Sequence, residues 1–398
     1  MNPFEQSSNV LVSCPKAIPP FLSEEIRALG FPVRAGIEAG VETCGTLADC
    51  MRLNLCLRTA HRVLYQLIQF RATTPDDLYA RVSDLPWEDY IPPDGYLTVD
   101  SSVETDAIRD SRFANVRCKD AIVDRLRRRF GRRPDSGPLQ SGAVVFLYWK
   151  GCQATLYLNT SGEPLSRRGY RKIPLGAPMQ ETLAAAVISA TGWDRSSHFV
   201  NPMCGSGTLA IEAAWIGLNR APGLLRPNFA FMHLNGFSDE AWQALRNAAR
   251  RAAVKTLRGR LIATDVNPKA IQSAQLNART AGVEQHIEFQ TCDFAETPVP
   301  EGSGVVILNP EYGERMGELA ALEPVYRGIG DFFKQRCLGY KGYVFTGNSD
   351  LAKRVGLRTR RRTVFFNSRI ECRLLEYELY GGTRRQFADQ PVEPVMPG

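Results

Sequence analysis

The spacing of hydrophobic residues changes near residue 165, and this change divides the chain into two halves. In the first half, strand-like and helix-like patterns follow no fixed order, which is typical of an α+β region. Strands are predicted over 9–14 and 96–103, and a hairpin over 143–160 that turns at Lys150–Gly151. Helices are predicted over 19–30, 47–57 and 118–131. The last helix is expected to turn Ile122, Val123, Leu126 and Phe130 inward.

From about residue 165 onward, strands alternate with helices. Strands are predicted over 198–204, 260–265, 286–293, 304–310 and 341–348, and helices over 181–193, 208–218, 239–257, 268–283 and 324–337. This rhythm predicts a mostly parallel sheet covered by helices on both faces. The segment 363–380 is expected to form a hairpin at the sheet edge, and 386–398 a flexible tail. We therefore expect three structured segments, 1–60, 61–160 and 165–385, before that tail.

The composition excludes several protein classes. With 44% hydrophobic and 23% charged residues, the chain is typical of globular proteins rather than disordered or collagen-like ones. No apolar run approaches the roughly 18 residues of a membrane span, and the N-terminus does not resemble a secretory signal. The ten cysteines include no C-x-x-C pair, so we expect reduced thiols, no metal site and a cytoplasmic location.

Arginine clusters are the main feature of the charge pattern, because the net charge of +7 is modest for this length. Six arginines fall within 125–133, and two further clusters lie at 167–172 and 358–362. Clustered guanidinium groups suit a phosphate-backbone partner, although each cluster could also be a solvated surface. The candidates for RNA binding are Lys119, Arg125, Arg128, Arg129, Arg132, Arg167 and Arg168.

A small-residue turn follows the strand at 198–204 and leads directly into a helix. Its residues Cys204-Gly205-Ser206-Gly207 would let the backbone approach a ligand at the carboxyl end of the strand, where doubly wound sheets bind ligands. The turn is not a phosphate loop, because no G-K-[ST] follows. A turn used only for packing is the alternative.

Acidic residues end the next two strands of this half, at Asp265 and Asp293. Asp265 suits hydrogen bonding to the two hydroxyls of a ribose, and Asp293 could accept from an adenine amino group. The dinucleotide fingerprint has about 20 residues between its glycines and its acid, whereas here an insertion with its own helix intervenes. A simple NAD site is therefore disfavoured. Either aspartate could also serve only as a helix N-cap.

The strand at 304–310 leads into the segment Asn309-Pro310-Glu311-Tyr312. This segment combines an amide, a backbone carbonyl beside a proline and an aromatic face. Such groups can accept hydrogen bonds from the exocyclic amine of a planar base while the ring stacks on it. The alternative is a strand-to-turn signal, since Asn-Pro often starts turns.

Taken together, NPMCGSGT, ATD, CDF and NPEYGER resemble a class I S-adenosylmethionine-dependent methyltransferase of the amino-group type. The segments DAIRDSRFANVRCKDAIVDRLRRRFGRRP, LNTSGEPLSRRGYRK and ETLAAAVISATGW resemble THUMP-domain RNA methyltransferases, and in particular the RlmL-type guanine-N2 methyltransferases of bacterial 23S rRNA. The resemblance spans about residues 8–385. It implies a ferredoxin-like segment over 1–60, a THUMP domain over 61–160 and a Rossmann-like methyltransferase domain.

The resemblance also implies roles for single residues. Asn201, Met203, Gly205 and Gly207, with Cys204 of the same turn, would hold the methionine part of S-adenosylmethionine. Asp265 would hold the ribose and Asp293 the adenine. Asn309, Pro310 and Tyr312 would bind the target guanine and direct its amine, so they are the predicted catalytic residues.

This sequence departs from the family pattern at two positions. Asn201 stands where the family usually has aspartate, and Glu311 stands at the second proline of the N-P-P-Y motif. Glu311 could hydrogen-bond the guanine edge instead. Some relatives carry a second methyltransferase domain behind the first; because the sequence ends at Gly398, we expect only the guanine-N2 half.

Three alternative functions remain open at this point. The same chemistry could act on tRNA. Adenine-N6 methylation of DNA is possible, but the RNA-type N-terminal half disfavours it. A catalytically decayed RNA-binding assembly factor is the third alternative, and an intact cofactor site argues against it. The sequence does not define the oligomeric state.

Overall fold

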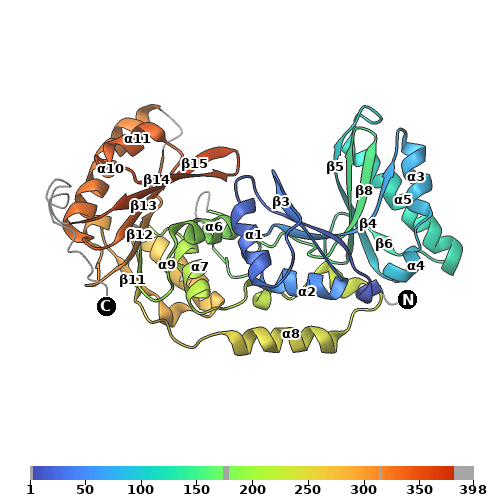
Figure 1. The fold of residues 1–398 in the computed structure, drawn as a ribbon, viewed down its shortest axis with the longest axis horizontal. Helices are drawn as coiled ribbons and strands as arrows, with labels where there is room; N and C mark the ends of the chain where they lie inside the picture. Colours follow the sequence, from blue (N-terminus) through green and yellow to red (C-terminus); the bar gives the residue numbers. More distant parts are fainter. Residues whose placement is uncertain (1–2, 174–178, 313–315, 381–398) are drawn as a thin grey trace, which may run out of the picture.

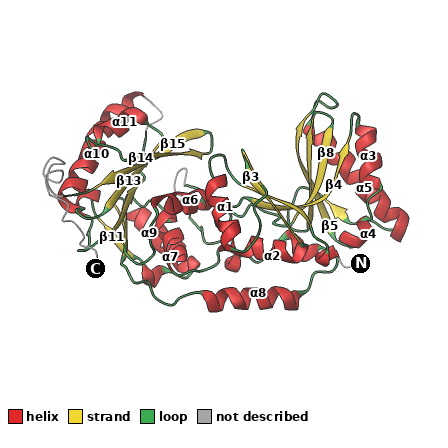
Figure 2. Ribbon diagram, in the orientation of Figure 1, coloured by secondary structure: helices red, strands yellow, loops and turns green. Residues whose placement is uncertain are grey.

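The computed structural model describes residues 3–173, 179–312 and 316–380, with only the backbone of 316–318. The predicted tail at 386–398 lies outside the described residues. Two β-sheets stand side by side, one in each half of the chain, with helices around them (Figures 1 and 2). The described residues contain no helix that is both long and apolar enough to cross a membrane.

The N-terminal half is built on one eight-stranded sheet of order β2-β3-β1-β4-β8-β7-β5-β6. Its strands are β1 Ser8–Ser13, β2 Ala35–Ile37, β3 Gly40–Gly45, β4 Arg62–Arg71, β5 Tyr96–Glu104, β6 Asp135–Ser136, β7 Ala143–Lys150 and β8 Gln153–Asn159. The predicted hairpin over 143–160 is confirmed as antiparallel β7 and β8. The sequence pattern missed β4, which pairs with both β1 and β8 and so makes the sheet continuous.

Helices flank this first sheet. They are η1 Pro3–Glu5, α1 Pro19–Ala28, α2 Leu47–Cys56, α3 Pro75–Ser83, α4 Trp87–Tyr90 and α5 Ser111–Phe130. Helix α5 packs on α3 and β5, with Ile122, Val123 and Leu126 buried as predicted. The prediction for Phe130 is wrong, since this residue is 43% exposed. It is the last residue of the helix, where Gly131 turns the chain into the left-handed conformation.

The C-terminal half contains a seven-stranded sheet of order β11-β10-β9-β12-β13-β15-β14. Its strands are β9 His198–Pro202, β10 Leu261–Asp265, β11 Glu288–Thr291, β12 Gly304–Leu308, β13 Lys341–Thr346, β14 Arg361–Asn367 and β15 Ile370–Glu378. The first five strands in this order are parallel, and the hairpin β14–β15 adds to them in antiparallel fashion. The predicted Rossmann-like sheet and its terminal hairpin are confirmed.

Helices cover both faces of the second sheet, as predicted. The described helices of the C-terminal half are α6 Glu181–Thr191, α7 Thr208–Gly217, α8 Asp239–Ala252, α9 Pro268–Ala281, α10 Met316–Arg336 and α11 Ser349–Arg354, with single turns η2 Pro222–Leu225, η3 Ala230–His233, η4 Glu284–His286 and η5 Phe294–Glu296. Alternate strand residues enter two different cores: Phe199 and Ile307 enter one, whereas Val200 and Val306 enter the other with α10. This alternation is the two-residue period expected of a strand buried on both faces.

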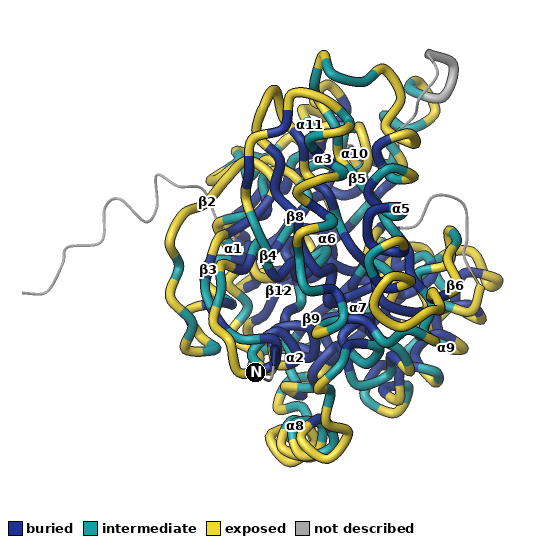
Figure 3. The backbone as a smooth tube through the Cα atoms, turned by 90° about the vertical axis from the view of Figure 1, so that its right-hand side faces the viewer, coloured by how far each residue is buried: buried dark blue, intermediate teal, exposed yellow. Residues whose placement is uncertain are grey.

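The insertion between α7 and β10 carries α8, which lies along the outside of the molecule (Figures 1 and 3). Trp242 is its one buried residue and packs on Phe229 and Phe231, with ring centroids 5.5 and 5.1 Å away. The helix contacts α2 of the N-terminal half. The insertion predicted from the long gap between Gly207 and Asp265 therefore spans the two halves of the chain.

A buried ionic cluster holds the two halves together. Arg168, only 2% exposed, pairs with fully buried Glu212 of α7 at 3.5 Å and donates to the backbone carbonyl oxygens of Leu165 and Arg58. Tyr170 donates to the same Glu212 carboxylate at 3.2 Å. Burial raises the pKa of Glu212, and the Arg168 guanidinium opposes that rise. The prediction that Arg168 binds RNA is wrong, because its guanidinium is enclosed by protein.

Arg58 extends this cluster toward the N-terminus. Its guanidinium donates to the carbonyl oxygen of Arg220 at 2.9 Å, and its backbone N–H donates to the carboxylate of Glu25 on α1 at 2.9 Å. Thr59 donates to the same carboxylate through its backbone and its hydroxyl. The cluster thus ties α1, the residues between α2 and β4, residues 165–170 and helix α7 into one unit.

We predict that Arg168→Ala lowers the free energy of unfolding by about 3–5 kcal/mol, because it leaves the Glu212 charge buried without its partner. Urea denaturation measures this change. Arg167→Ala is the matched control, since the Arg167 side chain is 72% exposed and its ion pair with Glu163 is at the surface; its cost should stay within about 0.5 kcal/mol. Equal effects of the two substitutions would contradict the role of the cluster.

Candidate cofactor and target-base site

The candidate site lies at the carboxyl edge of the second sheet. Strands β9, β10, β12 and β13 are parallel neighbours, so their ends meet at this edge. The chain proceeds outward from β9 to β10 and β11, and then in the other direction from β12 to β13. The crevice between β9 and β12 is therefore the switch point at which open α/β sheets bind ligands.

The turn after β9 has the form expected of a ligand cradle. Met203, Gly205 and Gly207 all have positive φ, at 56°, 54° and 83°. A Cβ added at Gly205 would meet nothing within 4 Å, so the backbone here is open to an approaching group. A Cβ added at Gly207 would lie 2.9 Å from that of Ala274 on α9. The two glycines thus differ in purpose, one leaving space for a ligand and the other allowing two helices to pack closely.

Asp265 fixes this turn at the end of β10. Its carboxylate accepts from the backbone N–H of Gly205 at 2.9 Å through Oδ2, and from that of Asn267 at 2.9 Å through Oδ1. The side chain is partly exposed, and the neighbouring Val266 is 68% exposed.

Asp293 is exposed beyond the end of β11. Its Oδ1 accepts from the backbone N–H of Ala295 at 2.9 Å and so caps the turn Phe294–Glu296. In this structure Asp293 therefore acts as an N-cap, the alternative role considered for it. Its Oδ2 accepts no hydrogen bond from any described residue.

Asn201 and Cys204 lie deeper than the sequence suggested. Asn201 is fully buried, and its amide donates to the carbonyl oxygen of Ile307 at 2.9 Å, which ties β9 to β12 across the crevice. Its Oδ1 is buried and has no hydrogen-bond partner among the described residues. Burial also raises the pKa of the Cys204 thiol, so this group stays neutral.

The Asn309–Tyr312 segment follows β12 at the other side of the crevice. Asn309 is partly buried, and its Oδ1 is a buried acceptor without a partner among the described residues. An unmet acceptor of this kind is costly in a folded protein and marks a place where a donor is expected. Pro310 is buried, whereas Glu311 is exposed. Residues 313–315 lie outside the described residues.

Tyr312 is held in place from neighbouring strands. Its hydroxyl accepts from Asn367 of β14 at 2.9 Å, and its carbonyl oxygen accepts from Asn348 at 3.3 Å. A Cβ added at Gly347 would lie 3.1 Å from the Tyr312 ring. Tyr326 of α10 donates to the carbonyl oxygen of Glu311 at 3.2 Å. The sequence pattern does not predict these supports, because they come from other elements and carry no motif.

The remaining basic candidates differ in how fully their side chains are already paired within the protein. Arg125 makes two 2.8 Å hydrogen bonds to Glu88 and two more to the carbonyl oxygens of Ser83 and Asp84, so it joins α5 to α4. The prediction that Arg125 binds RNA is therefore wrong, because its donors are already used within the protein. Arg128 and Arg129 are exposed in the last turn of α5, and Arg132 is exposed just after it. Lys119 lies 3.2 Å from Asp120, and Arg167 pairs with Glu163, both at the surface.

Comparison with known proteins decides the family. The model for the RMKL-like methyltransferase domain matches residues 168–376, about half of the chain. The chain belongs to the RMKL-like methyltransferase family. The models for the RlmL ferredoxin-like domain and the THUMP domain match residues 9–64 and 72–137. The predicted resemblance to THUMP-domain methyltransferases is therefore confirmed.

Several RMKL-like relatives are similar over most of this chain. The ribosomal RNA large subunit methyltransferase K/L of Syntrophotalea carbinolica is 39% identical over 97% of this chain, which spans only 55% of that relative's length. A putative RNA methyltransferase of Synechocystis, slr0064, is 36% identical over 90% of this chain and 93% of its own. The crystal structure of SMU.472, a putative methyltransferase complexed with S-adenosylhomocysteine, is 27% identical, with a TM-score of 0.85 over 95% of this chain and 99% of that one.

We predict that Gly207→Ala is more costly than Gly131→Ala. Both glycines have positive φ, at 83° and 70°, but a Cβ at Gly131 would meet nothing within 4 Å. Gly131→Ala should therefore lower the free energy of unfolding only by the cost of placing an L-residue in the left-handed conformation, about 1–2 kcal/mol. Gly207→Ala should lower it by about 1–3 kcal/mol more, since the added methyl group crowds Ala274. Chemical denaturation of both variants measures the difference, and equal losses would mean that α7 and α9 are not closely packed at this glycine.

Proposed function

We propose that this protein transfers a methyl group from S-adenosylmethionine to the exocyclic N2 amine of a guanine in 23S rRNA. The observation that carries this proposal is the buried, unmet Oδ1 of Asn309 at the switch point of a methyltransferase sheet. An acceptor in this position suits an amine donor. We also propose the division into 1–60, 61–160 and 165–385, with the first two segments holding RNA and the third carrying the reaction.

The residues at the carboxyl edge fit S-adenosylmethionine. The open face of Gly205 would admit the methionine part of the cofactor, and the Oδ1 of Asn201, in the strand that leads to this turn, is a buried acceptor without a partner among the described residues. Met203 and Cys204 complete that turn. Asp265 and Asp293 would accept from the ribose hydroxyls and the adenine amine. The complex of SMU.472 with S-adenosylhomocysteine, in a protein of the same fold, supports this assignment.

When bound, the cofactor supplies an activated methyl group on a sulfonium centre. The protein has to orient the amine, because the nitrogen lone pair is delocalised into the guanine ring. Asn309 Oδ1 and the carbonyl oxygen of Pro310 would accept from the amine and stabilise positive charge as it develops. Tyr312 would stack on a base that has left its helix. The hydrogen bonds to Asn367 and Asn348 hold Tyr312 in place for this role.

The choice of substrate rests on the relatives. Those 35–39% identical over most of this chain include several ribosomal RNA large subunit methyltransferases K/L, which makes 23S rRNA the first substrate to test. This chain spans about half of their length. Methyl transfer from labelled S-adenosylmethionine to unmodified 23S rRNA, tRNA and duplex DNA, with nucleoside analysis, tests the proposal. Formation of N2-methylguanosine in 23S rRNA supports the proposal. Label found only in tRNA or DNA overturns the assignment of 23S rRNA as the substrate.

We predict that Asn309→Ala lowers turnover by a factor of about 100 or more while cofactor binding is retained, because it removes an acceptor aimed at the developing charge. Single-turnover methyl transfer and calorimetric titration with S-adenosylhomocysteine measure the two quantities. Asn247→Ala, at an exposed position of α8, is the matched control and should behave as wild type. Wild-type turnover of the Asn309 variant would refute the assigned role.

We predict that Arg128→Glu/Arg129→Glu weakens RNA binding and flattens its salt dependence, because both side chains are exposed at the end of α5. Fluorescence anisotropy of labelled RNA across a salt series measures both effects. The exposed Arg251 on α8 provides the control substitution Arg251→Glu. Identical salt slopes for all three proteins would remove α5 from the RNA interface.

A further inference from the structure

The arginine cluster at 358–362 is not used by the site described above, yet a groove connects the two. This cavity of about 810 Å³ lies between α11 and the hairpin β14–β15. Its lining includes four cationic side chains, Lys353, Arg358, Arg362 and Arg373, and one carboxylate, Glu371. We call this cavity the basic groove.

Strand geometry explains why these cations share one face. Thr346 of β13 pairs with Arg373 of β15, and Leu375 of β15 pairs with Arg362 of β14. Because side chains alternate along a strand, residues two apart such as Arg373 and Leu375 point to the same side, together with their cross-strand partners. Helix α11 and the segment that follows it form the opposite wall.

The basic groove begins at the proposed target site. Gly347 and Asn348 line it, and both also contact Tyr312: the ring of Tyr312 packs on Gly347, and Asn348 donates to its carbonyl oxygen at 3.3 Å. A nucleotide stacked on Tyr312 would therefore have its neighbours in the strand at the mouth of this groove.

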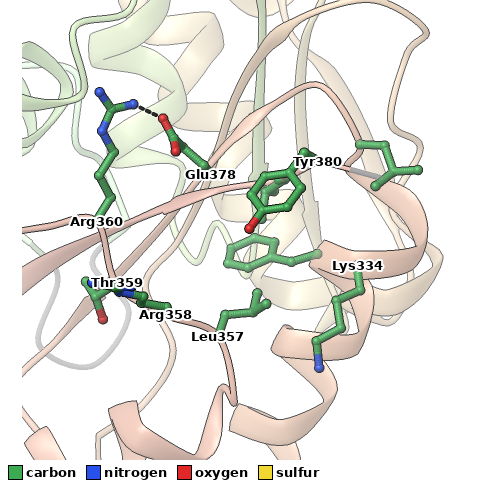
Figure 4. A pocket seen from close by; sticks show the side chains of 10 residues that line it. Lys334, Leu357, Arg358, Thr359, Arg360, Glu378 and Tyr380 are labelled. Atoms are coloured by element: carbon green, nitrogen blue, oxygen red, sulfur yellow. Dashed lines mark hydrogen bonds and ion pairs between the residues drawn. The ribbon is translucent and has the colours of Figure 1, made fainter. Parts of the chain in front are cut away.

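The far end of the groove opens into a second hollow of about 400 Å³. Leu357, Arg358 and Thr359 line both cavities, so this loop lies between them. Figure 4 shows the second hollow, with Tyr380 above Leu357 and Lys334 beside them. The Tyr380 side chain is 42% exposed. Surfaces that bind single-stranded nucleic acid usually combine cationic side chains with an exposed aromatic ring.

The charges of this region are unevenly paired. Arg360 and Arg361 form ion pairs with Glu376, and Arg373 pairs with Glu371. Lys353 pairs with Asp350. By contrast, Arg358 and Arg362 are exposed and make no ion pair with any described residue. Two guanidinium groups of the basic groove are thus without an ion pair among the described residues and available to an anionic partner.

We propose that the basic groove binds the RNA strand next to the target nucleotide, with Arg358 and Arg362 contacting its phosphates. This inference rests on the proposed function, because an RNA substrate is its premise. The groove would guide a single-stranded segment from Tyr312 toward the 357–359 loop. The N-terminal half would hold other parts of the RNA, and the groove would position the reacting nucleotide.

The test compares full-length wild type, Arg358→Glu/Arg362→Glu and the control Arg251→Glu. The probe is a labelled single-stranded RNA of about a dozen nucleotides, titrated by fluorescence anisotropy between about 50 and 200 mM salt. We expect the double variant to bind about tenfold or more weakly at the lowest salt, and its salt slope to fall by about 1.4, since each lost phosphate contact removes about 0.7 on single strands. The control should match wild type.

Two further measurements separate the possible outcomes. Titration with S-adenosylhomocysteine should give wild-type affinity for the double variant, which establishes that its fold and cofactor site are intact. Arg358→Lys/Arg362→Lys should restore the salt slope; if the reversal variant folds poorly, Arg358→Gln/Arg362→Gln carries the same comparison. Unchanged RNA affinity and slope in a folded double variant overturn the proposal.

Failure of the proposed function and failure of the groove proposal give different results. If wild type methylates none of the offered nucleic acids, the function fails, while the binding comparison still decides whether the groove holds RNA. If wild type methylates rRNA and the double variant has an unchanged KM, the groove is excluded although the function stands.

Discussion

The contact between Arg168 and Glu212 is the constraint on which the arrangement of the two halves depends. Both side chains are buried, and each is expensive to remove from water alone. The guanidinium offsets this cost through three different elements at once: the carboxylate on α7, the carbonyl oxygen of Leu165 and that of Arg58. Residues 165–168, which leave the first sheet toward the second, are therefore held in place by contacts to both halves. An RNA held by the first sheet would meet the carboxyl edge of the second in a fixed orientation.

Arginine serves two distinct purposes in this chain, and the sequence alone does not separate them. Arg125 and Arg168 lie within basic clusters, yet the donors of each are bonded to carboxylates and backbone carbonyl oxygens of the protein itself. Arg128 and Arg358 lie in similar clusters and face solvent. A planar guanidinium with five donors is well suited to a buried junction as well as to a phosphate. Local density of charge indicates neither which partner a given arginine has nor which way it points.

Local patterns predicted the second half of the chain better than the first. The parallel sheet follows from strands buried on both faces, and its strand ends bring Gly205, Asp265 and Asn309 to one edge by topology alone. In the first half, β4 was missed, although it joins β1 to β8. Its position depends on pairings between residues far apart in the sequence, such as Val10 with Tyr65 and Arg71 with Gln153, which a local pattern cannot contain.

The supports of the proposed target-base site could not be predicted from the sequence for the same reason, and they bear on the departure from the family motif at Glu311. The family motif has a second proline at this position, and its loss should loosen the loop. In the structure, hydrogen bonds hold the described part of this segment instead: Tyr326 donates to the carbonyl oxygen of Glu311 and also bonds Thr346 at 2.7 Å. Asn348 and Asn367 hold Tyr312 on the other side. The backbone carbonyl groups of Glu311 and Tyr312 are thus held by hydrogen bonds without a second proline, and the carboxylate of Glu311 stays exposed at the rim of the proposed site.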